Sequence, residues 1–231
     1  MIKGLNIVNI SEIVPEQSIG WLEIKLSQSV MTRLENYIET AKEQGEDQLS
    51  QLPDKTLYLK DKDGWFYQTV LSELIHKFSK SYPSYEIQQL THNSIPIGKA
   101  QFDILTTSTS YCLESFWVNF QKENEFNPLH NHTGIWSFVI WVKIPTDYKE
   151  QHAIPIGANN ATGRASNFEF HYTQILGDIA YHSYFLDKES EGNMLFFPSK
   201  MMHLVQPFYN CDKERISIAG NIYYDTISNN N

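Results

Sequence analysis

Two histidines separated by one residue are the first feature of this sequence that could carry chemistry. His130 and His132 lie within the segment 127–145. In an extended backbone, residues two positions apart project from the same face, so both imidazoles can point toward one metal ion. Neutral imidazole binds iron, zinc, copper and nickel. The spacing therefore predicts a pair of metal ligands but does not choose the metal.

A third histidine and an arginine follow later in the chain. His203 comes after the run 192–198, which has the pattern of a strand followed by a turn, and Arg215 lies 12 residues beyond His203. Arg215 and Ser217 share one face of a predicted strand. A planar guanidinium beside a hydroxyl suits a carboxylate, because the arginine can bind it through two parallel hydrogen bonds.

The order of these residues resembles the pattern of the 2-oxoglutarate/Fe(II) oxygenases, which have HxD/E, a distant His and then an Arg, often within Arg-x-Ser. The segments 127–145 and 192–222 look like those of a little-characterised subgroup from bacteria and marine phages, similar to prolyl hydroxylase-like oxygenases. The resemblance covers residues 112–224. It implies that His130, His132 and His203 hold Fe(II), and that Arg215 and Ser217 bind the distal carboxylate of 2-oxoglutarate. The implied activity couples oxidative decarboxylation of 2-oxoglutarate to C–H hydroxylation.

The sequence departs from the family pattern at His132, where most members have a carboxylate. Three neutral histidines would leave the metal with its full charge until the oxoacid binds. Asp178 or Glu169, each on or beside a neighbouring predicted strand, could supply a carboxylate in place of His132. The sequence thus leaves two versions of the ligand set open.

The residue that binds the oxoacid also has an alternative. Lys143 lies 11 residues after His132, and some members of the wider superfamily use a lysine on a comparable strand. Arg215 is preferred because it follows the third histidine at the expected distance. Arg164 could contact the substrate, or it could be a solvated loop charge.

Further side chains could line the same pocket. His171 and His182 lie in predicted strands, while Asn119 and Tyr111 precede the metal motif and could hydrogen-bond to the oxoacid. Large aromatic residues are expected to fill the β core instead, because aromatic β-formers pack well there: Trp117, Trp136, Trp141, Phe196 and Phe197.

Short runs rich in β-branched and aromatic residues must position these side chains. Candidate strands lie near 86–90, 100–106, 112–121, 135–144, 167–176, 179–186, 193–197 and 214–224. The segment 145–166 is rich in Pro, Gly and Asn and is a candidate lid over an active site. This pattern predicts a mainly β (α+β) fold, specifically a double-stranded β-helix of the jelly-roll or cupin type.

The N-terminal part has a different pattern of apolar and polar residues. Residues 21–26 alternate between apolar and charged types, as in a half-buried strand, and Ser27 can cap a helix that follows. Segment 42–64 is expected to be a polar connection. A second helix carries an apolar stripe from Phe66 to Phe78 and ends at Pro83. Both helices are predicted to pack outside the β-structure.

Length and composition set the remaining limits. The 231 residues predict a single domain over 1–231, with a strand and helical layer at 1–84, the β-helix core at 85–226 and a tail at 227–231. A net charge of −9 argues against nucleic acid as the main partner. The sequence shows neither a signal peptide nor an apolar run that could span a membrane. Two isolated cysteines favour the reducing cytoplasm.

Two other functions stay open at this point. The first is a cupin-like metal-dependent dioxygenase that does not use 2-oxoglutarate, and succinate production would separate it from the leading interpretation. The second is a non-catalytic β-helix module that binds a ligand or a protein, in which loss of the histidines would leave binding intact. The expected partners are dioxygen and an unidentified small-molecule or peptide substrate. The sequence does not identify that substrate or the oligomeric state.

Overall fold

The computed structural model describes residues 20–44, 56–82, 111–155 and 163–225 of the chain. The predicted strands near 86–90 and 100–106, Pro83 and the middle of the predicted lid lie outside these residues. Among the described helices, none is long and apolar enough to cross a membrane.

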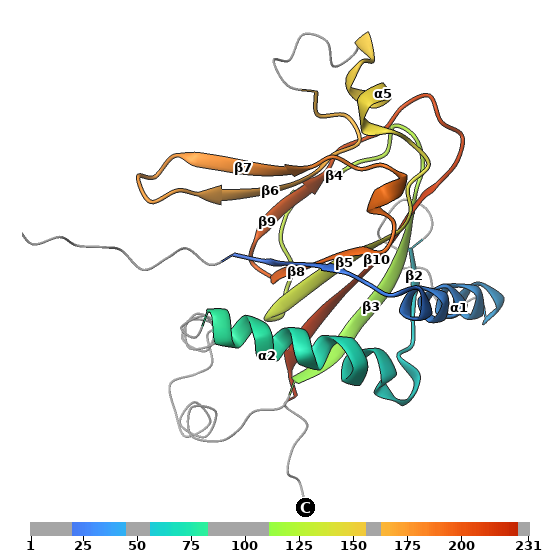
Figure 1. The fold of residues 1–231 in the computed structure, drawn as a ribbon, viewed down its shortest axis with the longest axis vertical. Coiled ribbons are helices and arrows are strands. Elements are labelled where there is room, and N and C mark those ends of the chain that lie inside the picture. Colours follow the sequence, from blue (N-terminus) through green and yellow to red (C-terminus); the bar gives the residue numbers. More distant parts are fainter. Residues whose placement is uncertain (1–19, 45–55, 83–110, 156–162, 226–231) are drawn as a thin grey trace, which may run out of the picture.

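Two antiparallel sheets form the body of the protein (Figure 1). The larger has the order β1-β8-β5-β10-β3-β2 and the smaller the order β4-β9-β6-β7. The larger sheet consists of β1 (Leu22–Lys25), β8 (Asn193–Pro198), β5 (Trp136–Lys143), β10 (Arg215–Tyr224), β3 (Tyr111–Gln121) and β2 (Thr56–Tyr58). The smaller sheet consists of β4 (Asn127–His130), β9 (Met202–Val205), β6 (Phe168–Thr173) and β7 (Ile179–Tyr184).

The two N-terminal helices cover the outer face of the larger sheet (Figure 1). The first is α1 (Gln28–Gln44), whose Val30 N–H donates to the Ser27 side chain at 3.5 Å, so the predicted cap is present. The second follows a 3₁₀ turn, η1 (Lys62–Gly64), and begins as a π-turn, η2 (Tyr67–Leu71), before α2 (Ser72–Ser81). The Asp61 carboxylate accepts from the N–H groups of Phe66 and Tyr67 at 2.8 and 2.9 Å, which satisfies donors that have no helical partner.

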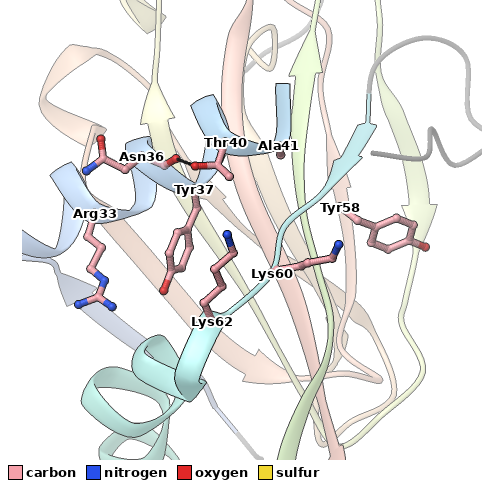
Figure 2. Close-up of a pocket in the computed structure, with 8 residues that line it drawn as sticks. All are labelled: Arg33, Asn36, Tyr37, Thr40, Ala41, Tyr58, Lys60 and Lys62. Atoms are coloured by element: carbon pink, nitrogen blue, oxygen red, sulfur yellow. Dashed lines mark hydrogen bonds between the residues drawn. The ribbon is translucent and has the colours of Figure 1, made fainter. Parts of the chain in front are cut away.

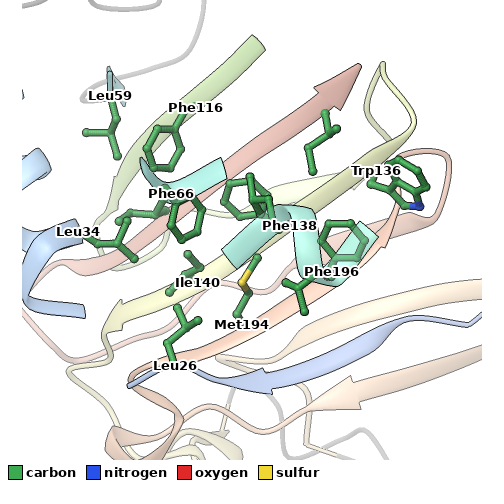
Figure 3. Packing of buried hydrophobic residues seen from close by; sticks show 14 of the residues in the cluster. Leu26, Leu34, Leu59, Phe66, Phe116, Trp136, Phe138, Ile140, Met194 and Phe196 are labelled. Atoms are coloured by element: carbon green, nitrogen blue, oxygen red, sulfur yellow. The ribbon is translucent and has the colours of Figure 1, made fainter. Parts of the chain in front are cut away.

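A large aromatic core joins the helices to the sheet (Figure 3). Phe66 is fully buried and stacks on Phe116, with ring centroids 5.5 Å apart and planes 5° apart. Phe78 packs edge-on against Trp136 and Phe196. Burial of each phenylalanine side chain stabilises the fold by about 1.5–3 kcal/mol, so this core holds the sheet rigid from outside.

A second buried cluster lies between the two sheets. Trp141 and Phe197 of the larger sheet pack with Phe168 and Phe170 of the smaller one. Successive residues of β10 point to opposite faces of the larger sheet, which separates the two clusters. Ile216, Ile218 and Ile222 pack in the outer core, whereas Ser217, Ala219 and Asn221 face the smaller sheet. The inner face is therefore free to carry polar side chains.

The structure is the predicted double-stranded β-helix with helices packed outside, and most predicted strands are present within two or three residues of their expected bounds. The prediction of segment 42–64 as a connection was incomplete, because β2 begins within it and adds to the edge of the larger sheet beside β3. β2 has only three residues, which is too short for a period to be visible. The remaining described elements are the short helices α5 (Tyr148–His152) and η4 (Lys188–Ser190).

Candidate metal centre and its cavity

The three predicted histidines meet at one end of the space between the sheets. His130 ends β4 and pairs in register with His203 of β9, while His132 lies two residues past the end of β4. One ligand atom from each of the three lies within 4.8 Å of the others. The Nε2 atoms of His132 and His203 are 3.1 Å apart. Two nitrogen ligands at right angles on one metal, each at about 2.1 Å, would be about 3 Å apart, so this pair fits a metal ion.

Backbone carbonyl groups orient two of the rings. His130 Nδ1 lies 2.6 Å from the Pro128 carbonyl oxygen, and His203 Nδ1 lies 2.9 Å from that of Met201. A carbonyl can only accept, so each Nδ1 carries the proton and each Nε2 keeps its lone pair. The hydrogen bonds that the two Nδ1 atoms donate to backbone carbonyls are typical of metal-binding histidines.

Burial keeps His132 and His203 neutral. Desolvation, reinforced by the neighbouring His130, lowers the pKa of His203 to about 3 and the pKa of His132 to about 4. Both imidazoles therefore carry lone pairs at neutral pH, as metal ligation requires. The donor set suits a divalent transition metal, although it does not distinguish Fe(II) from its neighbours.

Neither proposed carboxylate joins this group. Glu169 lies on β6 between Phe168 and Phe170, whose rings contact His203, so its side chain points to the opposite face. There Glu169 pairs with Arg164 at 3.3 Å and with His171 at 3.2 Å. Asp178 lies exposed in the turn between β6 and β7. Among the described residues, the cluster contains histidines alone.

Arg215 lies further along the same space, at the start of β10. Its side chain is 2% exposed, and burial lowers its pKa to about 10. Nη2 donates to the carbonyl and hydroxyl oxygens of Ser166 at 3.1 and 2.5 Å, and Nη1 donates to Gln121 Oε1 at 3.3 Å. Nε has no hydrogen bond. No carboxylate within the described ranges pairs with this guanidinium, so its charge is not compensated there.

A cavity with two adjoining parts lies between the histidines and Arg215. The part beside the histidines has a volume of about 400 Å³, and the part beside Arg215 about 170 Å³. Ser217, Asn119 and Asn127 line both parts. On β10, every second residue faces this cavity: Arg215, Ser217, Ala219, Asn221 and Tyr223. The prediction that Arg215 and Ser217 share one face is thus confirmed.

Comparison with known families agrees with this geometry. Residues 115–221 match the family described as "Putative 2OG-Fe(II) oxygenase". This region is similar to the 2OG-Fe(II) oxygenases, which are enzymes whose cofactors are Fe(II) and 2-oxoglutarate and which require dioxygen and a substrate. No curated protein matches the sequence.

Several solved structures are similar to this protein. The alpha-ketoglutarate-dependent carbocyclase SnoK from nogalamycin biosynthesis gives a TM-score of 0.51 at 10% identity, over 89% of this chain and 79% of that one. A Pseudomonas putida prolyl-4-hydroxylase gives 0.47 at 14% identity, over 88% and 92%. An oxidoreductase of the 2OG-Fe(II) oxygenase family from Burkholderia pseudomallei gives a TM-score of 0.34 at 14% identity, over 61% of this chain and 57% of that one. This chain therefore spans little more than half the length of that protein. At these identities the SnoK similarity concerns the fold alone.

Several side chains that the sequence placed near the site lie elsewhere. Lys143 faces a different hollow, beside Glu35 and Glu39 of α1. A bulge explains this: Ser217 pairs with Trp141 but Ile216 pairs with Lys143, so Val142 is an extra residue that turns Lys143 to the helical side. Lys143 is therefore not an alternative to Arg215 in this cavity.

Other predicted lining residues are also engaged away from the cavity. Arg164 pairs with Glu169 and lies 4.4 Å from the centre of the Tyr181 ring. His182 packs against Trp21 and Tyr184. Tyr111 packs against Trp136 at the far end of β3. None of the described residues of the predicted lid, 145–155 and 163–166, lines the cavity.

Some cavity residues were missed or misassigned. Trp117 was expected in the core, but it lines the cavity with its ring centroid 5.8 Å from that of His132. Asn221 was not considered, although its Oδ1 accepts from the buried Ser137 hydroxyl at 2.7 Å. Asn119 does line the cavity. Extending the two-residue period from Arg215 along β10 would have found Asn221 and Tyr223.

Proposed function

We propose that this protein is a hydroxylase that couples decarboxylation of 2-oxoglutarate to hydroxylation of a C–H bond in a small-molecule or peptide substrate. His130, His132 and His203 would hold Fe(II), and Arg215 with Ser217 would bind the distal carboxylate of 2-oxoglutarate. One observation carries the proposal: three convergent histidines, and a buried arginine that no described carboxylate neutralises, line two adjoining parts of one cavity.

Arg215 is suited to a carboxylate by what surrounds it. Its hydrogen-bond partners among the described residues are neutral oxygen atoms, and the centre of the Phe208 ring lies 5.0 Å from its guanidinium carbon. A buried charge without a counter-charge is unfavourable, so a ligand carboxylate that supplies one gains more than it would at the surface. The Ser217 hydroxyl, two residues along the same face, can donate a further hydrogen bond.

The apolar side chains of the cavity would keep water from the reaction. Val139, Phe168 and Phe197 line the part beside the histidines, and both phenylalanine side chains are buried. When bound, the iron and the oxoacid supply the oxidising chemistry, and this chain supplies ligands, orientation and a dry wall. We also propose a reducing compartment such as the cytoplasm, because Cys112 and Cys211 are both free thiols.

The test is an anaerobic calorimetric titration of 2-oxoglutarate into Fe(II)-loaded protein. Wild type and Lys143→Ala should bind it equally, whereas His203→Ala and Arg215→Ala should not bind it measurably. Succinate release under air should follow the same order. Unchanged affinity in Arg215→Ala would refute the assignment of the carboxylate site.

The histidine-only donor set also suits a cupin-like dioxygenase that binds its substrate directly to the metal. In that case, well-folded, metal-loaded wild type would not bind 2-oxoglutarate and would release no succinate.

A further inference from the structure

Ser166 has a backbone conformation that serine rarely adopts. Its φ is +71°, in the left-handed region. Among the described residues other than glycine, the three that share a positive φ are Asp63, Asn124 and Asn210. Asp and Asn enter this region more readily than serine does, because their short side chains form local hydrogen bonds there. Such conformations cost free energy and often occur at functional sites, so the Ser166 side chain calls for a role.

Neighbouring groups fix the turn that contains Ser166. Its N–H donates to the Pro207 carbonyl at 2.8 Å, and the N–H of the next residue, Asn167, donates to the Arg164 carbonyl at 3.1 Å. The Arg164 side chain is in turn anchored by its ion pair with Glu169. The turn is thus held on both sides of Ser166, which is fully buried.

The oxygen atoms of Ser166 are directed at Arg215. The Ser166 hydroxyl and carbonyl oxygens both accept from Nη2 of the guanidinium, at 2.5 and 3.1 Å. The hydroxyl also lies 3.2 Å from Thr146 Oγ1, which limits its rotation. Hydrogen bonds from a charged donor are roughly twice as strong as those between neutral groups. One nitrogen of the guanidinium is therefore fixed by two contacts with the same residue.

The two terminal nitrogens of Arg215 have different surroundings. Ser166 lines neither part of the cavity, whereas Gln121 lines the part beside Arg215. Nη1 donates to Gln121 Oε1 at 3.3 Å, which is long for a hydrogen bond of this kind. Nη2 is accordingly held behind the cavity wall, and Nη1 is turned toward the cavity. A carboxylate there would meet Nη1 and the Ser217 hydroxyl, and would replace the weak contact with Gln121.

We propose that Ser166 is a positioning residue for the oxoacid: it holds Nη2 of Arg215 so that Nη1 faces the distal carboxylate of 2-oxoglutarate. This inference rests on the proposed function and adds to it a residue outside the cavity. In the absence of the Ser166 hydroxyl, the guanidinium would become ordered only when the oxoacid binds. Immobilising one long side chain on binding weakens affinity roughly three- to tenfold.

The first experiment measures the order of the guanidinium without the oxoacid. It uses full-length protein loaded with Zn(II), which is diamagnetic and also binds imidazole. In ¹⁵N-edited NMR spectra, Arg215 of wild type should show separate Nη2 protons, assigned by their loss in Arg215→Met. Ser166→Gly removes the hydroxyl but allows the left-handed backbone, so these protons should average through rotation.

The matched control for this experiment is Asn210→Gly. Asn210 has the same backbone conformation, with a φ of +57°, but is exposed. The Nη2 protons of Arg215 should stay separate in this variant. Averaged Nη2 protons in wild type, or separate ones in Ser166→Gly, would overturn the proposal.

The second experiment compares 2-oxoglutarate with 2-oxopentanoate, an oxoacid of the same chain length that lacks the distal carboxylate. Both are titrated anaerobically into Fe(II)-loaded protein by calorimetry. Ser166→Gly should weaken 2-oxoglutarate binding roughly three- to tenfold and leave 2-oxopentanoate binding unchanged, because only the former reaches Arg215. A purely structural role of Ser166 would weaken both oxoacids equally, and that result would overturn the proposal. Asn210→Gly should bind both as wild type does.

The same titrations distinguish this inference from the proposed function. A metal-loaded wild type that does not bind 2-oxoglutarate would refute the proposed function, and with it any role of Ser166 toward the oxoacid, even if the guanidinium is ordered. Tight binding by wild type that Ser166→Gly leaves unchanged would refute only the role of Ser166.

Discussion

Replacement of Arg215 by methionine should make the free protein more stable while removing its affinity for 2-oxoglutarate. Burial lowers the pKa of Arg215 from the ordinary value of arginine to about 10, and at 1.36 kcal/mol per unit this corresponds to about 3 kcal/mol against the charged form in the folded state. Because the folded-state pKa is the lower one, the penalty is fully present below pH 10 and declines only as the pH rises above that value.

The substitution also removes hydrogen bonds, which reduces the gain. Gln121 can turn its oxygen to water in the cavity, and the Ser166 hydroxyl keeps Thr146 as a partner at 3.2 Å. The Ser166 carbonyl loses its donor in a buried position, which costs about 1–3 kcal/mol. A net gain of about 1 kcal/mol in the free energy of unfolding follows for Arg215→Met.

Urea denaturation of metal-free protein measures this gain, with Lys143→Met as the control for loss of an exposed cation. With Fe(II) and 2-oxoglutarate at one hundred times Kd, wild type should gain about 2.7 kcal/mol and overtake the variant, which gains nothing from the oxoacid. If Arg215→Met were less stable than wild type without ligands by more than about 1 kcal/mol, the arginine would be a structural residue. The argument for a carboxylate site would then fail.

Three further predictions address the metal, the core and the helix start. His203→Ala should abolish the visible absorption of Co(II)-substituted protein while His182→Ala leaves it unchanged, because only His203 belongs to the cluster; an intact spectrum in His203→Ala would contradict the ligand assignment. Phe66→Ala should lower the free energy of unfolding by about 3–5 kcal/mol in urea, since it leaves a cavity against Phe116; a loss below 1 kcal/mol would show that the core collapses around it. Asp61→Ala should lose about 0.5–2 kcal/mol through its two backbone N–H contacts, whereas exposed Glu123→Ala should lose nothing measurable in the same assay; equal losses would argue against the capping role.

The ordered set of histidines and Arg215 could be predicted from sequence because each rests on a two-residue period or a recognisable spacing. An interruption of the same two-residue period in β5 explains why Lys143 does not lie in the cavity, where the sequence had allowed it. A bulge at Val142 reverses the face of the residue that follows, and no local sequence signal marks it. Trp117 was misassigned because an aromatic residue on a strand packs equally well on either face. Only the arrangement of the second sheet shows which face holds the cavity.

The hollow that Arg33, Lys60 and Lys62 line between α1 and the segment after β2 could not be predicted from sequence (Figure 2). Arg33 and Lys60 lie on separate elements, and their proximity depends on how α1 packs beside β2. Residues far apart in sequence give no periodic signal for such a meeting. By contrast, the outer core could be anticipated from the apolar stripes of the two helices, because a stripe on a helix must be buried against something.

The bulges beside β10 determine where this fold can change its length. β3 and β5 flank β10 on either side, and each contains one extra residue: Glu114 in β3 and Val142 in β5. β10 itself runs without an extra residue from Arg215 to Tyr223. An insertion in either neighbour near its bulge can be absorbed by local bending, whereas an insertion within 215–223 would exchange the cavity face for the core face. Among related sequences, insertions and deletions should therefore occur in β3 and β5. The length of β10 should stay constant, because it sets the separation of the residues on its inner face.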